Sequence, residues 1–245
     1  MENVNMYKIE MEICSEAIFT SGEKERNLVQ SRAQTDEYGF VYFHAKTLKG
    51  QLKRQGYWLL GQYSNLNRNL ATSFYDSIIN LFGINYIEAK NIKEKYGLEL
   101  SKDGQQAGLI RLSNLELDKN LRNYFINLQE NDVENEYYRI SPHDLIEAQT
   151  HIRTGIQLEE GVAKNKMLNT FHTVRKGLIF YSTVSFEEKS SDIMIKDLAK
   201  IVYSLRRIGA GIHRGRGEVN SRLFIEQSGD YYHNFMCEEG KNVSL

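Results

Sequence analysis

A glycine-rich run with arginines around it is the segment of the sequence best suited to bind a ligand. It spans residues 209–217 and reads GAGIHRGRG. Glycine lets a backbone pass close to another molecule, and arginine binds carboxylates and phosphates through charge-assisted hydrogen bonds. The arginines in or just before the run that could contact an anion are Arg206, Arg207, Arg214 and Arg216. The run therefore predicts a contact with anionic groups, and the alternative interpretation is a tight turn with solvated arginines.

Glycine-rich runs also occur in dinucleotide-binding proteins, but the order of elements is reversed here. A dinucleotide fingerprint follows a strand and opens a helix. The run 209–217 follows a helical pattern and precedes a strand pattern. We therefore expect no nucleotide cofactor at this loop, and the sequence predicts no other cofactor.

A second basic cluster lies on the first predicted helix. It comprises Lys46, Lys49, Lys53 and Arg54, and no acidic residue lies between His44 and Arg54. A solvated helix face is the ordinary explanation for such a cluster. If this helix lies beside the glycine-rich run, the two basic patches form one groove for a phosphate backbone.

Residues suited to acid–base or metal chemistry are scattered along the chain. Histidine can act as an acid or a base on a ribose hydroxyl. The candidates are His44, His151, His172 and His213. A lone histidine is more often structural or in contact with a ligand than catalytic. Cys14 and Cys237 are far apart in the sequence and no Cys/His cluster has metal-binding spacing, so we expect neither a disulfide nor a metal site.

Strands are expected where apolar and polar residues alternate, because successive side chains of a strand point to opposite faces. In the first such segment, Tyr7, Ile9, Met11 and Ile13 alternate with charged residues. The predicted strands are 7–13, 178–186 and 218–225, with a further strand region at 108–117.

Helices are expected where apolar residues recur every three or four positions. The first begins at Lys46, and a second apolar segment at 77–83 ends in a glycine suited to a helix C-terminus. Another helical stripe, 198–208, ends at Gly209.

The remaining segments lack periodicity. Residues 21–38 predict a long loop, 118–170 an insertion of loops and short elements, and the residues after Gln227 a polar tail. The core order is strand, helix, strand, strand, helix, strand, which is the order of an α+β ferredoxin-like fold. One domain with elaborations is the simplest organisation.

The composition is that of a globular protein, with 41% hydrophobic and 26% charged residues. No stretch has the roughly 18 consecutive apolar residues of a membrane-spanning helix, and residues 1–6 lack the pattern of a signal peptide, so we expect a cytoplasmic protein without membrane contact. The formal net charge of -1 argues against a protein that holds nucleic acid by bulk electrostatics alone. Any such contact must come from local patches.

Several motifs, in order, resemble those of the RAMP superfamily of CRISPR-associated proteins. Residues 35–53 read TDEYGFVYFHAKTLKGQLK and are similar to the family's acidic turn, aromatic strand and "SLKGALR"-like helix start, although FHA replaces the usual Ile-Pro-Gly. The other matching segments are NLFG at 80–83, AGLIRLSN at 107–114, THIRTGI at 150–156, GVA at 161–163, KGLIF at 176–180 and the glycine-rich run.

The motifs and the length look most like the backbone subunits of type III effector complexes. The resemblance implies one RAMP domain over residues 1–245, with an RNA-recognition-like palm and an insertion of about 118–170 acting as a thumb. It implies a structural subunit of an antiviral ribonucleoprotein. The implied partners are guide RNA, target RNA and other effector subunits, which could include copies of the chain itself. A subunit that caps the 5′ end of the guide shares the same motifs.

The resemblance also assigns RNA contacts to particular basic residues. On this interpretation the phosphates of the RNA contact the two basic clusters and one residue of the insertion. The predicted RNA-binding residues are Lys46, Lys49, Lys53, Arg54, Arg153, Arg207, His213, Arg214 and Arg216.

Some backbone subunits of this kind cut target RNA with an aspartate between the first strand and the first helix. The corresponding position here falls near Gln30, and no acid occurs between Arg26 and Gln34. Glutamine cannot accept a proton or bind a metal as a carboxylate does. We therefore predict a subunit without cleavage activity of its own. The alternatives are an endoribonuclease that uses Glu25, Asp36 or His44, and a protein-interaction module that does not contact RNA.

Overall fold

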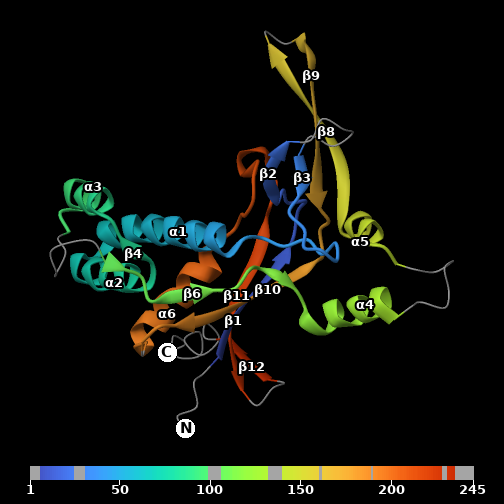
Figure 1. Ribbon diagram of the computed structural model, residues 1–245. Helices are drawn as coiled ribbons and strands as arrows, with labels where there is room; N and C mark the ends of the chain where they lie inside the picture. Colours follow the sequence, from blue (N-terminus) through green and yellow to red (C-terminus); the bar gives the residue numbers. More distant parts are fainter. Residues whose placement is uncertain are drawn as a thin grey trace, which may run out of the picture.

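The computed structural model describes residues 6–24, 31–98, 106–131, 140–159, 162–188, 190–227 and 231–234. Its main sheet has the strand order β12-β11-β1-β10-β6, and β7 also pairs with β10. The strands are β1 (Met6–Ile13), β6 (Ile110–Leu112), β7 (Glu116–Leu117), β10 (Ile179–Phe186), β11 (Val219–Gln227) and β12 (Tyr231–Asn234). Every pairing in this sheet is antiparallel, and the first strand lies at its centre (Figure 1).

One face of the main sheet is apolar because its strands alternate. Ile9 pairs with Ser182 on one side and Leu223 on the other, and all three are buried. Met11 continues the buried row, whereas Glu12 on the opposite face is exposed. The alternation that predicted β1, β10 and β11 is therefore confirmed.

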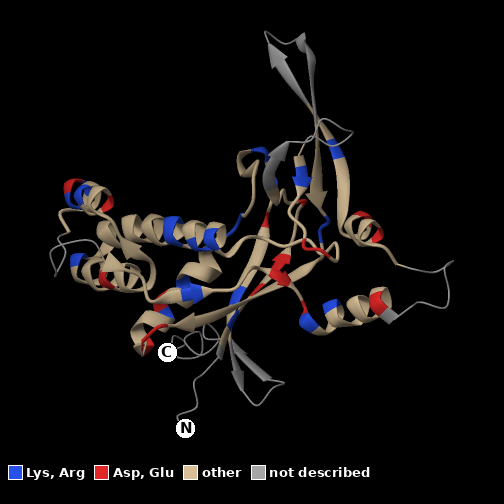
Figure 2. Cartoon of the chain, in the orientation of Figure 1, with Lys and Arg blue, Asp and Glu red and all other residues tan. Residues whose placement is uncertain are grey.

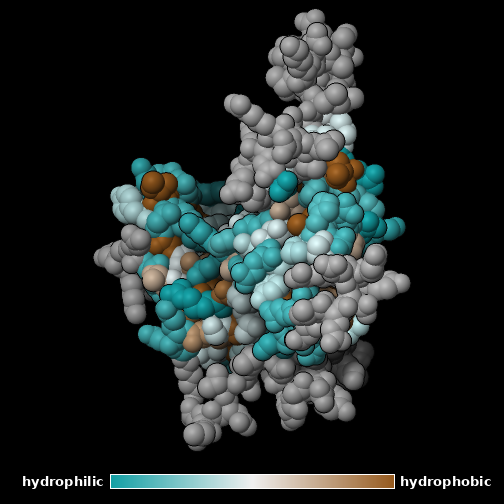
Figure 3. Space-filling view, turned by 45° about the vertical axis from the view of Figure 1, so that its right-hand side comes forward, coloured by the Kyte–Doolittle hydropathy of each residue, from teal (hydrophilic) through white to brown (hydrophobic). Residues whose placement is uncertain are grey.

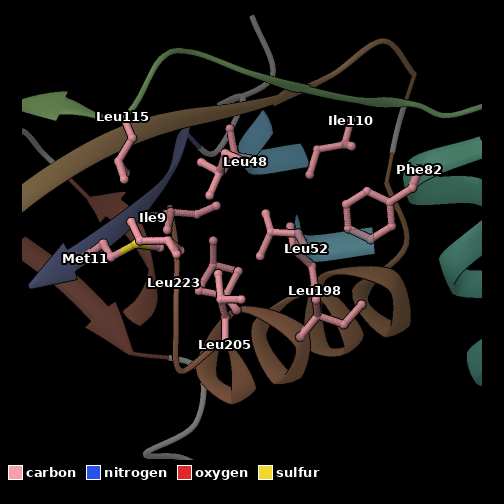
Figure 4. Packing of buried hydrophobic residues seen from close by; sticks show 14 of the residues in the cluster. Ile9, Met11, Leu48, Leu52, Phe82, Ile110, Leu115, Leu198, Leu205 and Leu223 are labelled. Carbon is pink, nitrogen blue, oxygen red and sulfur yellow. The ribbon is translucent and has the colours of Figure 1, made fainter. Parts of the chain in front are cut away.

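Helices cover the apolar face. They are α1 (Ala45–Leu66), α2 (Arg68–Phe82) and α6 (Asp192–Ser204). Leu48 and Leu52 of α1 point toward the sheet residues Ile9 and Leu223, and Leu198 of α6 lies in the same cluster (Figure 4). The sequence-predicted first helix is confirmed, and its buried side is the stripe through Leu48 and Leu52.

A second sheet lies beside the main body, in the order β2-β3-β9-β8. Its strands are β2 (Thr20–Lys24), β3 (Ser31–Ala33), β8 (Thr150–Glu159) and β9 (Val162–Val174). The β8–β9 hairpin projects from the body, with α5 (Pro142–Gln149) at its base (Figure 1). The helix α4 (Lys119–Asn131) packs beside β7. The remaining elements are β4 (Gly83–Ile84), α3 (Tyr86–Tyr96), β5 (Gln106–Ala107) and the 3-10 turn η1 (Ile212–Arg214).

Several sequence expectations need correction. The predicted loop at 21–38 contains part of β2 and all of β3, and the insertion at 118–170 contains two helices and most of a long hairpin rather than short elements. The predicted strand at 108–117 is broken into β6 and β7, and the residues after Gln227 include β12. Short strands and strands whose residues do not alternate leave no period-2 signal.

The helix predicted from the apolar stripe 198–208 begins and ends earlier in the chain than expected. The helix α6 begins at Asp192, after the Ser191 cap, and ends at Ser204 although the apolar stripe continues to Ile208. The Ser221 hydroxyl of β11 donates to the carbonyls of Val202 and Leu205, at 2.6 and 3.0 Å, and so satisfies the end of the helix. Beyond that point Leu205 and Ile208 are still buried in the core, although they are not helical.

The structure is a mixed α+β fold with largely antiparallel sheets. Among the described residues, no helix is both long enough and apolar enough to cross a membrane.

Candidate nucleic-acid interface

A groove of about 530 Å³ lies between α1 and the segment that follows α6. Its walls carry three arginines, two aromatic side chains and two amides. The lining residues are Gln51, Arg54, Gln55, Trp58, Tyr203, Ser204, Leu205, Arg206, Arg207 and Ile212. None of these described residues is acidic. The helix α1 itself carries basic residues and no acidic ones (Figure 2).

Hydrogen bonds and ring contacts hold the groove in shape. The Gln55 amide donates to the Ser204 carbonyl at 3.1 Å, which joins α1 to the end of α6. Arg207 donates through Nη1 to the Ile212 carbonyl at 2.6 Å, and the Arg206 guanidinium lies 5.3 Å from the centroid of the Tyr203 ring. Two of the three arginines are thus positioned before any ligand binds. Of the predicted basic cluster on the first helix, only Arg54 lines the groove, together with Arg206 and Arg207, which precede the glycine-rich run, and Ile212 within the run.

The glycines of the glycine-rich run have two kinds of surroundings, because some lie against the protein's own backbone and Gly215 lies in open space. Gly209 and Gly217 have φ of 84° and 71°, and a Cβ on either would lie within 2.5 Å of the chain's own carbonyl oxygens. Their close approach is therefore to this protein's backbone and not to a ligand. Gly215, with φ of 76°, has no atom within 4 Å of such a Cβ, and it follows the exposed turn that carries His213 and Arg214.

Arg216 lies at the junction between this run and β9. Its guanidinium is 4.7 Å from the centroid of the Phe171 ring. Nη1 of Arg216 is buried and has no hydrogen-bond partner among the described residues. Arg216 therefore joins the run to the base of the hairpin, whereas Arg214 projects into solvent.

The lysines of the first helix divide between several surroundings. Lys49 donates to the Ile110 carbonyl at 2.8 Å, and burial lowers the pKa of Lys49, with nearby Arg111 and Lys53 acting in the same direction. Lys53 pairs with Glu88 of α3 at 2.7 Å. Lys46 is exposed. The structure thus gives Lys49 and Lys53 protein partners outside the groove.

Arg153, on β8, is also engaged by the protein. Its Nε lies 3.1 and 3.0 Å from the two carboxylate oxygens of Glu16, and its Nη2 donates to Glu16 as well. The Thr173 hydroxyl also donates to the Glu16 carboxylate, at 3.3 Å. These contacts, led by the Arg153 hydrogen bond, lower the pKa of Glu16.

The candidates for cleavage have structural contacts. Asp36 accepts hydrogen bonds from the backbone N–H groups of Tyr38 and Phe40, at 3.1 and 2.8 Å, and pairs with Arg122 at 2.7 Å. His44 caps α1 by accepting from the Lys46 N–H at 3.2 Å. Glu25 lies outside the described residues.

The remaining reactive groups include His172 and Cys14. Burial lowers the pKa of His172, whose Nδ1 accepts from the Ala33 N–H at 3.5 Å. Cys14 is a free thiol, and Cys237 lies outside the described residues. In the part of the chain that the structure describes, no group of three or more His, Cys, Asp or Glu could hold a metal ion.

Two aromatic residues of the groove were not predicted from the sequence. Trp58 is 57% exposed and Tyr203 is 46% exposed. An available signal was the position of Trp58, four residues after Arg54 and outside the buried stripe of α1. On the face shown in Figure 3, hydrophobic residues form small separate groups among hydrophilic ones.

Comparisons with known proteins place the chain in a family. A sequence model described as the RAMP superfamily matches residues 10–220. No curated protein sequence matches the chain. A chain in a cryo-EM structure of the type III-B Cmr-beta complex bound to cognate target RNA has 14% identity and a TM-score of 0.57, covering 89% of this chain and 96% of its own length.

The apo state of the Cmr-beta complex gives a similar result. Its matching chain has 12% identity and a TM-score of 0.57, with the same two coverages. In both comparisons the shared fold covers nearly the whole length of each chain. Because the family model spans most of the sequence, this chain belongs to the RAMP superfamily.

Proposed function

We propose that the chain is an RNA-binding structural subunit of a type III CRISPR effector complex, which holds guide RNA by its backbone and does not cut RNA itself. The observation that carries the proposal is the groove between α1 and the segment after α6, with three arginines and no acidic residue among its described lining. Arginines presented in this way bind phosphate oxygens. In a RAMP-superfamily chain, the ligand that fits them is RNA.

The local character of the groove suits a protein of near-zero net charge. The whole chain has a formal charge of -1, so attraction to RNA is confined to patches such as this one. Contacts to phosphates position a strand without reading its sequence. Specificity then comes from base pairing between guide and target, as in other RNA-guided systems.

Gly50 on α1 supports the same proposal. It lies inside the helix, it is exposed, and a Cβ there would have no atom within 4 Å. A glycine in a helix interior costs roughly 0.5–1 kcal/mol relative to alanine. Packing within the chain does not require it, so a ligand strand that approaches the helix backbone gives it a role.

The strand order supports a ferredoxin-like palm. The four strands β11, β1, β10 and β6 are adjacent in that order, and α1 and α6 follow β1 and β10 along the chain. This is the arrangement of a split βαβ fold, in which the fourth strand lies beside the first. We assign the whole chain to one such domain. The insertion with α4, α5 and the β8–β9 hairpin is its thumb.

The partners follow from the same assignment. One similar solved chain belongs to a complex bound to cognate target RNA. We therefore propose guide RNA, target RNA and other effector subunits as partners, which could include copies of this chain, in a cytoplasmic assembly. Phosphate contacts are assigned first to Arg54, Arg206 and Arg207, with Lys46, His213 and Arg214 as exposed additions.

The absence of cleavage is part of the proposal. Asp36 is held by Arg122 and two backbone N–H groups, and Nδ1 of His44 caps a helix, so both residues have structural roles. Incubation of the purified protein with labelled target RNA and divalent metal should leave the RNA intact. Cleavage that disappears in Glu25→Ala would favour the endoribonuclease alternative.

The proposal is tested by reversing charge in the groove. In Arg54→Glu/Arg206→Glu, we expect the complex purified from its native host to lose most of its short guide RNA. The matched control is Lys90→Glu/Lys119→Glu, which makes the same charge change on exposed positions of α3 and α4. Equal RNA recovery from both double variants would contradict the proposal. A chain that purifies without RNA or other effector subunits would favour the protein-interaction module.

A further inference from the structure

Trp58 forms a ridge between two hollows. On one side lies the arginine-lined groove, and on the other lies a hollow of about 860 Å³ between α1 and α3. The second hollow is lined by the aromatic residues Tyr57, Trp58 and Tyr96, the amides Gln62, Asn65 and Asn91, and by Gly61, Glu88, Ile92 and Lys95. Its one acidic side chain, Glu88, is paired with Lys53. Trp58 lines both hollows.

The exposure of Trp58 is not needed for packing. The buried side of α1 consists of Leu48, Leu52, Gly56 and Leu60, and Trp58 lies outside it. Single exposed apolar residues are common on protein surfaces. What distinguishes Trp58 is its surroundings, because Arg54 precedes it by one helical turn and Tyr203 faces the same groove.

An exposed indole beside arginines is suited to an unpaired nucleobase. Every base has a π face that stacks on an aromatic ring, while its phosphate binds nearby arginine. Arginine side chains alone would suffice for a phosphate contact with a duplex. An aromatic surface becomes useful only where a base is out of its stack.

We infer that Trp58 is a stacking platform for an unpaired RNA base whose phosphates contact Arg54, Arg206 and Arg207. The inference rests on the proposed function and adds a specific contact to it. The strand crosses the α1 ridge at the indole and continues toward the hollow beside α3. There the amides of Gln62 and Asn91 offer donors and acceptors to further bases.

A protein partner is the competing occupant of this ridge. Indoles are frequent anchors of protein interfaces. The groove favours RNA because its described lining has three arginines and no acid. Its exposed large aromatics, Trp58 and Tyr203, can stack on bases while the arginines bind phosphates.

The experiment uses the intrinsic fluorescence of the protein, because Trp58 is the only tryptophan in the chain. A single-stranded oligouridylate of twelve nucleotides is added at low ionic strength. Binding is followed by anisotropy of a labelled oligonucleotide, and stacking by the emission of Trp58 with an unlabelled one. We expect binding to quench the indole emission. An abasic strand of the same length should bind through its phosphates without that quenching.

The variants test the same contact through affinity. Trp58→Ala should weaken oligouridylate binding roughly tenfold, and Trp58→Phe should retain most of it. The matched control is Tyr86→Ala, because Tyr86 is 76% exposed on α3 and lines neither hollow. Its affinity should equal that of the wild type.

The outcomes separate this inference from the proposed function. Binding without quenching, together with an unchanged affinity of Trp58→Ala, would overturn the stacking role and leave the RNA-binding proposal intact. Normal RNA affinity with loss of co-purifying subunits in Trp58→Ala would assign the indole to a protein interface instead. No binding of oligouridylate by the wild type would overturn both.

Discussion

Arg153 and Glu16 form a two-pronged ion pair between β8 and the segment that follows β1, with the Arg153 Nε 3.1 and 3.0 Å from the two carboxylate oxygens. Glu16 also accepts from Thr173 of β9, and its backbone carbonyl accepts from the Gly217 N–H at 2.9 Å. One residue thus joins the projecting hairpin, the first strand and the glycine-rich run. Arg153 therefore supports the hairpin, and it could contact RNA only if its ion pair with Glu16 opened.

The pair should make stability depend on acid pH. The Arg153 hydrogen bond lowers the pKa of Glu16 below its unfolded value of roughly 4.3. A lowered pKa contributes stability above the unfolded pKa, and that contribution is lost as the pH falls through the folded pKa. Glu16→Gln should therefore be less stable than the wild type in urea at pH 7, and the difference should shrink toward pH 3. Glu94→Gln is the control, because its pair with Lys90 is exposed.

Gly217 and Gly215 offer a matched comparison of backbone strain. Both have positive φ, but a Cβ on Gly217 would lie 2.0 Å from the Ile208 carbonyl oxygen, whereas one on Gly215 would meet nothing within 4 Å. Gly215→Ala should cost about 1 kcal/mol of unfolding free energy from its φ alone. Gly217→Ala should cost more than about 2 kcal/mol, because the backbone must move. Chemical denaturation measures both, and equal losses would contradict the close approach.

Gly50→Ala should separate stability from binding. Removing an exposed glycine from the interior of α1 should raise the unfolding free energy by roughly 0.5–1 kcal/mol. If RNA approaches the helix at this position, the added methyl should weaken RNA binding in the same protein. Denaturation and anisotropy report the two effects. A stabilised variant with unchanged RNA affinity would remove Gly50 from the interface.

Asp36 should affect folding and not catalysis. Asp36→Ala removes the acceptor for Tyr38 and Phe40 and the partner of Arg122, and should cost about 1–3 kcal/mol of unfolding free energy. Asp36→Asn retains an acceptor oxygen and should cost less. Denaturation of the two variants gives the order. An RNA cleavage activity that is abolished in a fully stable Asp36→Asn would contradict the structural role.

The elements that could be predicted are those with one buried face. β1, β10 and β11 alternate because each has one side in the core, and α1 is recognised from Leu48 and Leu52. Strands β2 and β3 have five and three residues, too few for a reliable period. The α6 stripe overran its helix because Leu205 and Ile208 are buried without being helical.

The sequence predicted a groove between two basic patches, but not which of their residues would line it. Lys49, Lys53 and Arg153 are engaged by Ile110, Glu88 and Glu16, which lie 61, 35 and 137 residues away along the chain. Such partners depend on tertiary structure and leave no local pattern. Trp58 was overlooked because an aromatic residue in a helix is ordinarily taken as part of a core.

The central place of β1 has a consequence for synthesis. Its neighbours are β10 and β11, so Ile9 cannot form its strand pairs with Ser182 and Leu223 until those strands have been synthesised. At roughly 5–20 residues per second, a ribosome needs about ten to thirty-five seconds to travel from β1 to β10. During that time β1 has an apolar face and two unpaired edges. The nascent chain therefore spends this interval open to aggregation, and a chaperone that shields the first strand would raise the yield of folded protein.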